Sequence, residues 1–541
     1  MTNAMQSGTQ NELMEWTFRS SRNDPDPFND VEFSVVFKDP DGVERTVPAF
    51  WSGDNCWRVR FSSPVIGRHT WASRCSNVAD TGLHGQTGEF EVGPYTGTNP
   101  LLVHGPLQVS QNRRHFEHRD GKPFFWLGDF WTMGLSRHLK WPDDFQLLTA
   151  DRVEKGFSVI LVIAGLYPDM PPLDERGANE AGLPWEKDFS RINPAFFDMM
   201  DLRISWLVRS GLVPCIVGCW SFWLLLLGVE GMKKHWRYLV ARYGAYPCVW
   251  TIAGEVMMEY YLSEDPEHDS IFQRTHWPEV IRYVRQIDPW RHPMTIHPRH
   301  GGPPDVRDCA HNVIDDASIL DFDMLQTGHS DSASVPNTVE RVVEAYAHKP
   351  TMPVINGEVC FEGHCGANWQ NIQRQMFWFC MLSGAAGHTY GANGVEHANS
   401  REHPYGVTPQ GTGWCYLTWE EGYRLPGSTQ VGLGRKLLER YEWWRMQPHP
   451  EWVDPHWNRN EYLFPHAAGI PGELRVIFTG NPECVIRDLE LDASYRAFWF
   501  DPMSGEETDI GVIRGDDHGD WKSPPMPVYK EWILVLERAE P

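Results

Sequence analysis

Two glutamates, Glu255 and Glu358, each follow a short apolar segment, and their spacing suits acid–base chemistry. The segments read PCVWTIAGE (residues 247–255) and MPVINGE (residues 352–358). Short apolar runs with β-branched residues are typical of buried strands, and barrels present catalytic acids where such strands end. Cleavage of a glycosidic bond needs two carboxyl groups, one to protonate the leaving oxygen and one to attack or to activate water. The pair therefore predicts glycoside hydrolysis.

The composition is that of a globular chain with many tryptophans. With 541 residues the chain is too long for one core, so several domains are expected. The 26 tryptophans fill cores, but an indole also stacks on the apolar face of a sugar ring, which favours a carbohydrate ligand over a nucleotide. The formal net charge of −24 argues against nucleic acid and against an anionic membrane surface as partners.

The cysteines and the N-terminal residues favour the cytoplasm. Eleven cysteines without a C-x-x-C pair fit reduced thiols better than a disulfide framework. Residues 1–16 are polar and lack the charged start and apolar core of a secretory signal. The nearly apolar run 212–229 contains Pro214, Gly218 and Ser221, so we interpret it as a buried strand followed by an apolar loop, not as a membrane span.

Between the two ends, the pattern of strand, loop and helix repeats eight times. The expected strands are 123–127, 158–163, 213–217, 249–253, 293–297, 320–326, 354–356 and 386–390, and helical stretches lie between most of them. Eight such units predict a (β/α)₈ TIM barrel, whose active site lies at the C-terminal ends of its strands. Glu255 then follows the fourth strand and Glu358 the seventh.

Short alternating strands flank the barrel on both sides and predict antiparallel β-sandwiches. The expected strands are 31–37, 56–61, 69–73 and 88–92 before the barrel, and 473–479, 495–500 and 532–537 after it. The expected domains are residues 1–104, 105–448 and 449–541. Barrels with such flanking domains can pair through them, which leaves a homo-oligomer open.

Other polar and aromatic residues are expected at the same end of the barrel as the glutamates. They are Asp129 and Trp131 after the first strand, Trp220 after the third, His297 ending the fifth, Gln326 and His329 after the sixth, and His388 and Tyr390 ending the eighth. As a set they suit binding of sugar hydroxyls and stacking on a sugar ring. Glu259 and Glu362, each four residues beyond one of the pair, are the alternative carboxylates if the strand ends are misplaced.

Several segments resemble the apiosidase-like glycoside hydrolases. In the barrel these segments are GKPFFWLGD (121–129), RYGAYP (242–247) and GHTYGA (387–392). Residues 29–31 and 57–61 resemble the sandwich that precedes such barrels, and residues 500–506 resemble a small closing sandwich of the collagen-binding type. The resemblance covers nearly the whole chain and agrees with the architecture expected above.

The resemblance implies a retaining glycosidase of clan A, with Glu255 as acid/base and Glu358 as nucleophile. Members of this clan often carry Asn directly before the acid/base, where it binds the sugar 2-hydroxyl, but this chain has Gly254. The sugar specificity of the clan is therefore not carried over. The expected substrate is an oligosaccharide or glycoside, cleaved without a cofactor. Cleavage from the chain end is expected because long segments after the second and eighth strands can wall the cleft into a pocket.

Two other functions are considered. A carbohydrate-binding barrel without activity fits the flanking sandwiches, but the presence of both strand-end glutamates counts against it. A metal-dependent barrel hydrolase is suggested by the histidines His292, His297 and His300. The chain has neither an H-E-x-x-H motif nor an H-x-H at the first strand, so no metal is expected.

Overall fold

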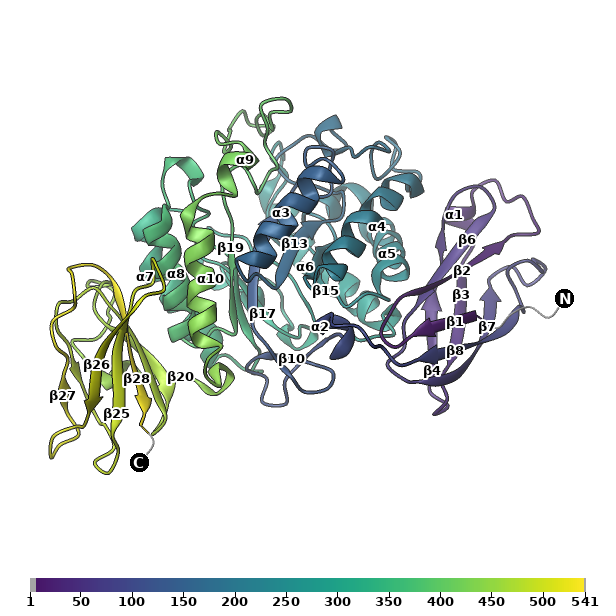
Figure 1. Ribbon diagram of the computed structural model, residues 1–541. Helices are drawn as coiled ribbons and strands as arrows, with labels where there is room; N and C mark the ends of the chain where they lie inside the picture. Colours follow the sequence, from purple (N-terminus) through teal and green to yellow (C-terminus); the bar gives the residue numbers. More distant parts are fainter. Residues whose placement is uncertain (1–5, 540–541) are drawn as a thin grey trace.

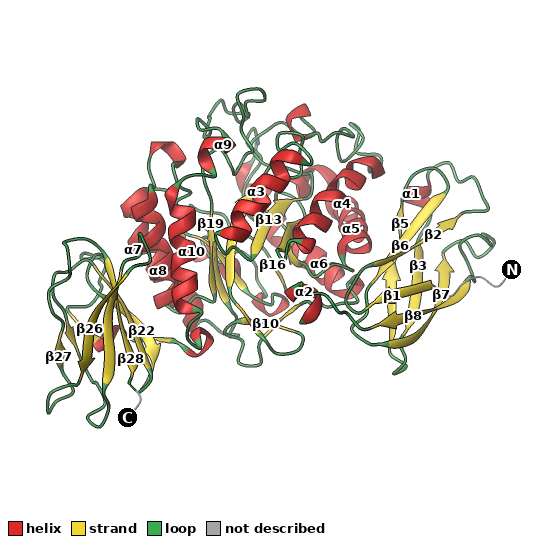
Figure 2. Cartoon of the chain, viewed as in Figure 1, coloured by secondary structure: helices red, strands yellow, loops and turns green. Residues whose placement is uncertain are grey.

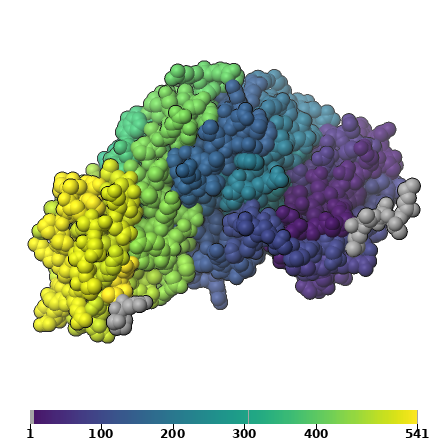
Figure 3. Space-filling view, viewed as in Figure 1, coloured from purple at the N-terminus to yellow at the C-terminus, as the bar shows by residue number. Residues whose placement is uncertain are grey.

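The computed structural model describes residues 6–539 and shows a central barrel between two β-sandwiches (Figure 1). The three bodies follow one another in chain order, from the purple sandwich through the barrel to the yellow sandwich (Figure 3). This architecture confirms the predicted fold class. The exact domain boundaries, 104/105 and 448/449, stay predictions.

The barrel consists of eight parallel strands that follow the chain order, with β12 joining β19 to close the ring. They are β12 (Trp126–Trp131), β13 (Val159–Ile163), β14 (Val213–Val217), β15 (Val249–Thr251), β16 (Met294–Thr295), β17 (Asp323–Gln326), β18 (Val354–Glu358) and β19 (Gly387–Tyr390). Helices cover the outside (Figure 2): α3 (Asp143–Glu154), α4 (Pro194–Arg209), α5 (Trp223–Tyr243), α6 (Pro266–Ile287), α7 (Val335–Ala347), α8 (Gln370–Leu382) and α10 (Pro426–Leu438). After β16 the chain forms short 3₁₀ turns instead, at Pro304–Val306, Ala310–Asn312 and Ala317–Ile319.

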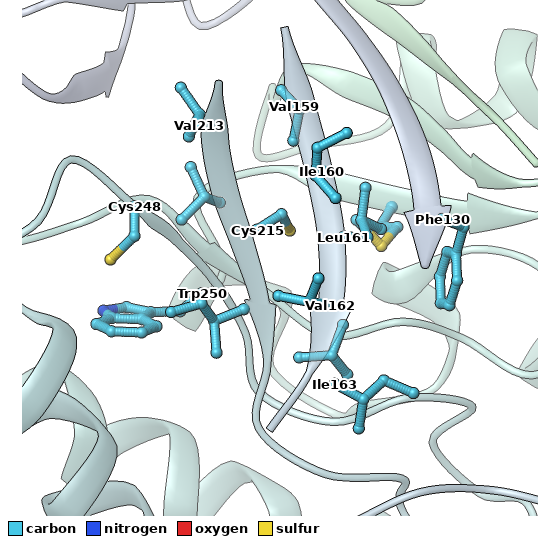
Figure 4. Close-up of a cluster of buried hydrophobic side chains, with 14 of the residues drawn as sticks. Phe130, Val159, Ile160, Leu161, Val162, Ile163, Val213, Cys215, Cys248 and Trp250 are labelled. Atoms are coloured by element: carbon cyan, nitrogen blue, oxygen red, sulfur yellow. The ribbon is translucent and has the colours of Figure 1, made fainter. Parts of the chain in front are cut away.

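The barrel strands are continuous apolar runs because both of their faces are buried. Each residue of β13, from Val159 to Ile163, is fully buried, with side chains on both sides of the strand (Figure 4). Strands packed between a barrel interior and a helix layer have no solvent face, so they lack the polar alternation of an exposed sheet. This is why such segments are recognisable in the sequence.

Two features close the remaining gaps in the barrel. β16 and β17 do not pair as a ladder. Instead, the Thr295 hydroxyl donates to the Phe322 carbonyl at 2.8 Å, and the Asp321 amide N–H donates to the Met294 carbonyl at 2.9 Å. A small sheet of β9 (Leu107–Val109), β10 (Phe116–His118) and β11 (Pro123–Phe124) lies at the lower end in Figure 1. Phe116 of this sheet packs against Trp126 and Phe322. The opposite end is left for the loops that follow the strands.

Two local predictions were wrong. The first barrel strand was expected at 123–127, but Pro123 belongs to the edge strand β11, where its missing N–H costs no ladder bond. The apolar run was expected to continue as a loop, but it enters α5 at Trp223, with a break at Gly228 (φ 67°, ψ 173°). No helix within residues 6–539 combines the length and apolarity needed to cross a membrane.

The sandwiches each pair a larger with a smaller sheet. The N-terminal one has β1 (Gln6–Thr9), β8 (Thr87–Gly93), β7 (Gly67–Cys75), β3 (Phe33–Lys38) and β4 (Glu44–Pro48) facing β2 (Met14–Arg19), β6 (Cys56–Phe61) and β5 (Phe50–Trp51). The C-terminal one has β20 (Gln447–Pro448), β22 (His466–Ile470), β23 (Leu474–Thr479), β28 (Trp532–Arg538), β25 (Tyr495–Phe500) and β26 (Glu507–Ile513), with β21 (Val453–Asp454), β24 (Val485–Ile486) and β27 (Trp521–Lys522). The pairs are antiparallel as predicted, except that β1 runs parallel to β8.

A buried ion cluster attaches the first sandwich to the barrel. Asp201 of α4 accepts from Arg60 of β6 at 3.1 Å and from Arg242 of α5 at 2.9 Å. Burial alone would raise the pKa of Asp201, but the two guanidinium groups outweigh it and hold the pKa below its usual value. Asp198, one turn earlier on α4, also pairs with Arg242, but its side chain is 49% exposed.

We expect Asp201→Ala to destabilise the protein by about 3–5 kcal/mol, because it removes the buried carboxylate that two buried arginines share. Asp198→Ala removes a more exposed partner of the same arginine and is expected to cost less than about 1 kcal/mol. Thermal unfolding of the two variants, run side by side, measures the difference. Equal shifts in the unfolding midpoint would show that the cluster does not hold the sandwich to the barrel.

Candidate active site

A cavity of about 520 Å³ lies at the C-terminal ends of the barrel strands. The predicted site residues that line it are Trp220, Glu255, Gln326, His329 and Glu358. They come from the ends of four different strands, β14, β15, β17 and β18, so only the closed barrel brings them together. The loop segment that carries α9 (Trp419–Gly422) rises at this end, at the top of Figure 1.

Glu255 occupies a constrained turn that follows β15. Its backbone has φ +45°, a left-handed conformation that costs free energy for any residue other than glycine. The Ser221 hydroxyl holds this turn by donating to the Glu255 carbonyl at 2.7 Å, and the Trp220 indole N–H donates to Glu255 Oε2 at 3.2 Å. The surrounding structure thus fixes both the backbone and the carboxylate of Glu255.

The packing around Gly254 explains why this chain lacks the asparagine that members of clan A often carry directly before the acid/base. A Cβ atom at this position would lie 2.2 Å from the indole ring of Trp220, which packs directly over the glycine. An asparagine side chain therefore has no room unless Trp220 moves. Trp220 takes this space and supplies its own donor to the carboxylate of Glu255.

We expect Gly254→Ala to destabilise the protein by about 1–3 kcal/mol, the usual cost of overpacking a filled site. The same substitution is expected to cost much less in a Trp220→Ala background, because the ring that it strikes is then absent. Thermal unfolding of the wild type, both single variants and the double variant measures this coupling. An undiminished cost in the Trp220→Ala background would contradict the explanation.

Gln326 joins the two strand-end glutamates. Its Nε2 donates to Glu255 Oε1 and to Glu358 Oε1, and each of the two distances from nitrogen to oxygen is 2.9 Å. Because one nitrogen reaches both oxygens, they cannot lie further apart than twice that length. For these two oxygens, the bound is closer to the ~5–5.5 Å that separates the carboxyl groups of retaining glycosidases than to the ~6.5–9.5 Å of inverting ones.

Two histidines surround the other carboxylate. Glu358 is the last residue of β18, with His329 Nε2 2.9 Å from its Oε1 and the fully buried His297 Nε2 3.3 Å from its Oε2. Burial by itself would raise the pKa of Glu358, but the two imidazoles outweigh it and hold the pKa well below its usual range. Glu255 differs, since burial and then the charge of Glu358 raise its pKa. The cavity therefore sets one carboxyl group up as an acid and the other as an anion.

Two predicted site residues of the first strand do not reach the cavity. Asp129 is fully buried and accepts from Arg152 of α3 at 2.6 Å and from the Trp131 indole at 2.6 Å. Trp131 packs against Phe145 of the same helix. Side chains alternate along a strand, so positions 129 and 131 of β12 face the helix layer. The predicted strand was shifted too far toward the N-terminus for this alternation to be used.

The residues predicted at the last strand behave in the same way. His388 packs against Phe377 of α8, and the Tyr390 hydroxyl donates to Glu362 at 2.6 Å, outside the cavity. Glu362 also accepts from the Gly427 amide at 3.0 Å, which makes it a structural acceptor. Glu259, the other alternative carboxylate, lines the cavity but pairs with Arg299 at 2.8 Å.

Other cavity residues were not predicted. Phe130 and Thr132 face inward between the outward-facing positions, and strict alternation along β12 would have found them. Asp169 and Glu396 come from the long loops after β13 and β19, which have no periodic pattern to locate their side chains. Burial raises the pKa of Glu396 to about 7. Residues 6–539 contain no group of three or more His, Cys, Asp or Glu side chains arranged to hold a metal ion.

Comparisons with known proteins place the barrel in one family. Residues 110–445 match the family described as apiosidase-like, catalytic domain, and residues 9–76 match a domain of unknown function, DUF5060. No curated protein matches the chain.

Solved structures share the fold. A glycoside hydrolase family 5 protein from Bacteroides vulgatus is 20% identical over 82% of this chain and 94% of its own, with a TM-score of 0.67. A candidate glycoside hydrolase from the same organism is 18% identical over 99% of this chain and 100% of its own, with a TM-score of 0.69. At these identities the likeness shows the fold alone, including the arrangement of the barrel and the flanking domains.

Proposed function

The chain belongs to the apiosidase-like family and is a glycoside hydrolase, and on this basis we propose that it acts with retention of configuration, with Glu255 as acid/base and Glu358 as nucleophile. The observation that carries this proposal is the single amide nitrogen of Gln326, which lies 2.9 Å from both carboxylates. Such a short separation is closer to the ~5–5.5 Å of retaining glycosidases than to the ~6.5–9.5 Å of inverting ones, which supports attack by the second carboxylate itself.

The reaction then proceeds in two displacements. Glu358, kept ionised by His297 and His329, attacks the anomeric carbon, while Glu255 donates its proton to the glycosidic oxygen and the aglycone leaves as an alcohol. A covalent glycosyl ester on Glu358 results. Glu255, now ionised, removes a proton from water, whose oxygen attacks the anomeric carbon and releases Glu358. Gln326 can donate to whichever carboxylate carries the charge at each step.

We further propose that the enzyme acts from the chain end of its substrate. The loop that follows β19 is tied to two other loops: the Tyr405 hydroxyl donates to the Pro168 carbonyl after β13 at 3.2 Å, and the Gln410 amide donates to the Tyr261 carbonyl after β15 at 2.8 Å. Pro168, Tyr261 and Gln410 also line the cavity. Loops joined in this way support a pocket more than an open groove.

The proposal also includes a reducing compartment, the cytoplasm. All eleven cysteines are free thiols, and most of them are buried. Burial raises the pKa of several, among them Cys219 and Cys309, which keeps these thiols protonated and unreactive. Such a set of thiols is more typical of intracellular proteins than of secreted ones.

Hydrolysis of a panel of aryl α- and β-glycosides, both pyranosides and furanosides, tests the proposed function. We expect release of the aryl alcohol from at least one member of the panel and loss of that activity in Glu358→Ala. Binding of a sugar without hydrolysis of any glycoside or natural oligosaccharide would favour the carbohydrate-binding alternative instead.

A further inference from the structure

Glu396 places a carboxylate in the cavity that the mechanism above does not use. Its side chain is 12% exposed, and no hydrogen bond from residues 6–539 reaches either carboxylate oxygen. The nearest nitrogen that can carry a charge, His397 Nδ1, is 3.6 Å from Oε2. Leaving a buried carboxylate without hydrogen-bond donors is costly, so natural proteins rarely retain one without a ligand or a function.

The neighbours of Glu396 are already engaged with one another. His397 turns Nε2 toward Asp169 at 3.4 Å and Nδ1 toward the Cys415 thiol at 3.0 Å. Asp169 in turn accepts from the Tyr261 hydroxyl at 2.8 Å. The protein therefore orders the surroundings of Glu396 without supplying the donors that its carboxylate needs. A ligand bound in the cavity can supply them.

The charges in the cavity limit what this ligand can be. Asp169, Glu259 and Glu396 line it in addition to the two catalytic carboxylates. Among the described lining residues Arg299 is the single arginine or lysine, and it pairs with Glu259. A carboxylate, sulfate or phosphate on the sugar would meet several negative charges with no free arginine. Burial alone would lower the pKa of His397, but the neighbouring Cys415 and Glu396 outweigh it and raise this pKa, which favours a positive charge on the imidazole beside Glu396.

We propose that Glu396 is a substrate-binding residue that accepts hydrogen bonds from two neighbouring hydroxyl groups of the glycone, and that the cavity takes an uncharged sugar and rejects a uronate. The inference rests on the proposed glycosidase function. Adjacent hydroxyl groups suit a carboxylate because each oxygen can accept one of them. Above its pKa of about 7, which burial raises, Glu396 is ionised, and hydrogen bonds to an ionised acceptor are about twice as strong as neutral ones.

Monodeoxy analogues of the aryl glycoside that the wild type cleaves best test the contact directly. In the wild type, we expect removal of either contacted hydroxyl to lower kcat/KM by about 10- to 10²-fold, the usual effect of losing one hydrogen bond to a charged group. In Glu396→Ala the same removals are expected to cost less than about threefold. Each penalty is a ratio measured within one variant, so partial loss of folded protein does not affect it.

Glu396→Gln keeps the shape of the side chain and is expected to show intermediate penalties. Glu402 is an exposed residue of the same loop, and its carboxylate pairs with Lys140. Glu402→Gln therefore serves as the matched control and should behave as the wild type. Deoxy penalties in Glu396→Ala equal to those of the wild type would overturn the contact. Faster cleavage of the matching uronide or amino sugar than of the neutral glycoside would overturn the assigned sugar class.

Calorimetric titration with free neutral monosaccharides separates this inference from the proposed function. Binding that is lost in Glu396→Ala, in a chain that hydrolyses no glycoside, would overturn the hydrolase and keep the inference. Hydrolysis by the wild type with unchanged kcat/KM in Glu396→Ala would keep the hydrolase function and overturn the inference about Glu396. If the protein neither binds a sugar nor hydrolyses a glycoside, both the function and the inference are overturned.

Discussion

Replacing Glu358 by alanine is expected to lower kcat by about 10⁴-fold or more, because the variant cannot form the glycosyl ester that both displacements require. Added azide is expected to restore turnover by entering the space that the carboxylate leaves. Because azide then attacks the substrate directly in a single displacement, the glycosyl azide should have the opposite anomeric configuration to the substrate. Product analysis by NMR and the dependence of rate on azide concentration measure both effects.

The corresponding variant of the other glutamate provides the matched control. In Glu255→Ala the ester on Glu358 still forms, and azide attacks that ester, so two displacements give a glycosyl azide with the configuration of the substrate. Opposite configurations from the two variants would therefore assign the two roles in one experiment. A glycosyl azide of unchanged configuration from Glu358→Ala would mean that another residue is the nucleophile.

Replacing Glu255 by alanine is expected to remove the decline of kcat/KM at high pH. Burial and the charge of Glu358 raise the pKa of Glu255 in the folded protein. The acid must be protonated to act, so wild-type activity is present below this pKa and is lost as the pH rises through it. The low pKa of Glu358 places the other decline at a more acidic pH than an ordinary glutamate would.

The effect of Glu255→Ala should depend on the leaving group. For a poor leaving group we expect a loss of about 10²–10⁴-fold, the usual contribution of a general acid. A dinitrophenyl glycoside, which leaves without protonation, should lose little in its first step. A high-pH decline that persists in Glu255→Ala with the same apparent pKa would show that another group, such as Glu396, controls it.

Elements with a strong period could be predicted from the sequence. β13 and β14 are apolar on both faces, and Glu255 and Glu358 were located because each ends such a run before a turn. The pair that we propose as catalytic follows from this pattern and from the closure of the barrel, which brings the ends of separate strands together. The pKa difference between the two carboxyl groups depends on His297 and His329, whose distances to Glu358 no pattern in the chain reveals.

The errors had two physical causes. Asp129 and Trp131 lie within β12 instead of after it, and His388 and Tyr390 lie on β19 as expected, but all four occupy the alternate positions that face away from the cavity. The loop residue Glu396 is different, because its position depends on how a long irregular segment folds back over the barrel. Such segments carry no repeating signal, although they supply much of the cavity wall.

The central claim is that Glu358 and Glu255 carry out two successive displacements at the anomeric carbon. Proton NMR of the first sugar released by the wild type, recorded before the anomers equilibrate, tests this most directly. The account predicts a product with the same anomeric configuration as the substrate. A product of inverted configuration would contradict it, because a single displacement by water would then be the reaction and Glu358 would act as a base.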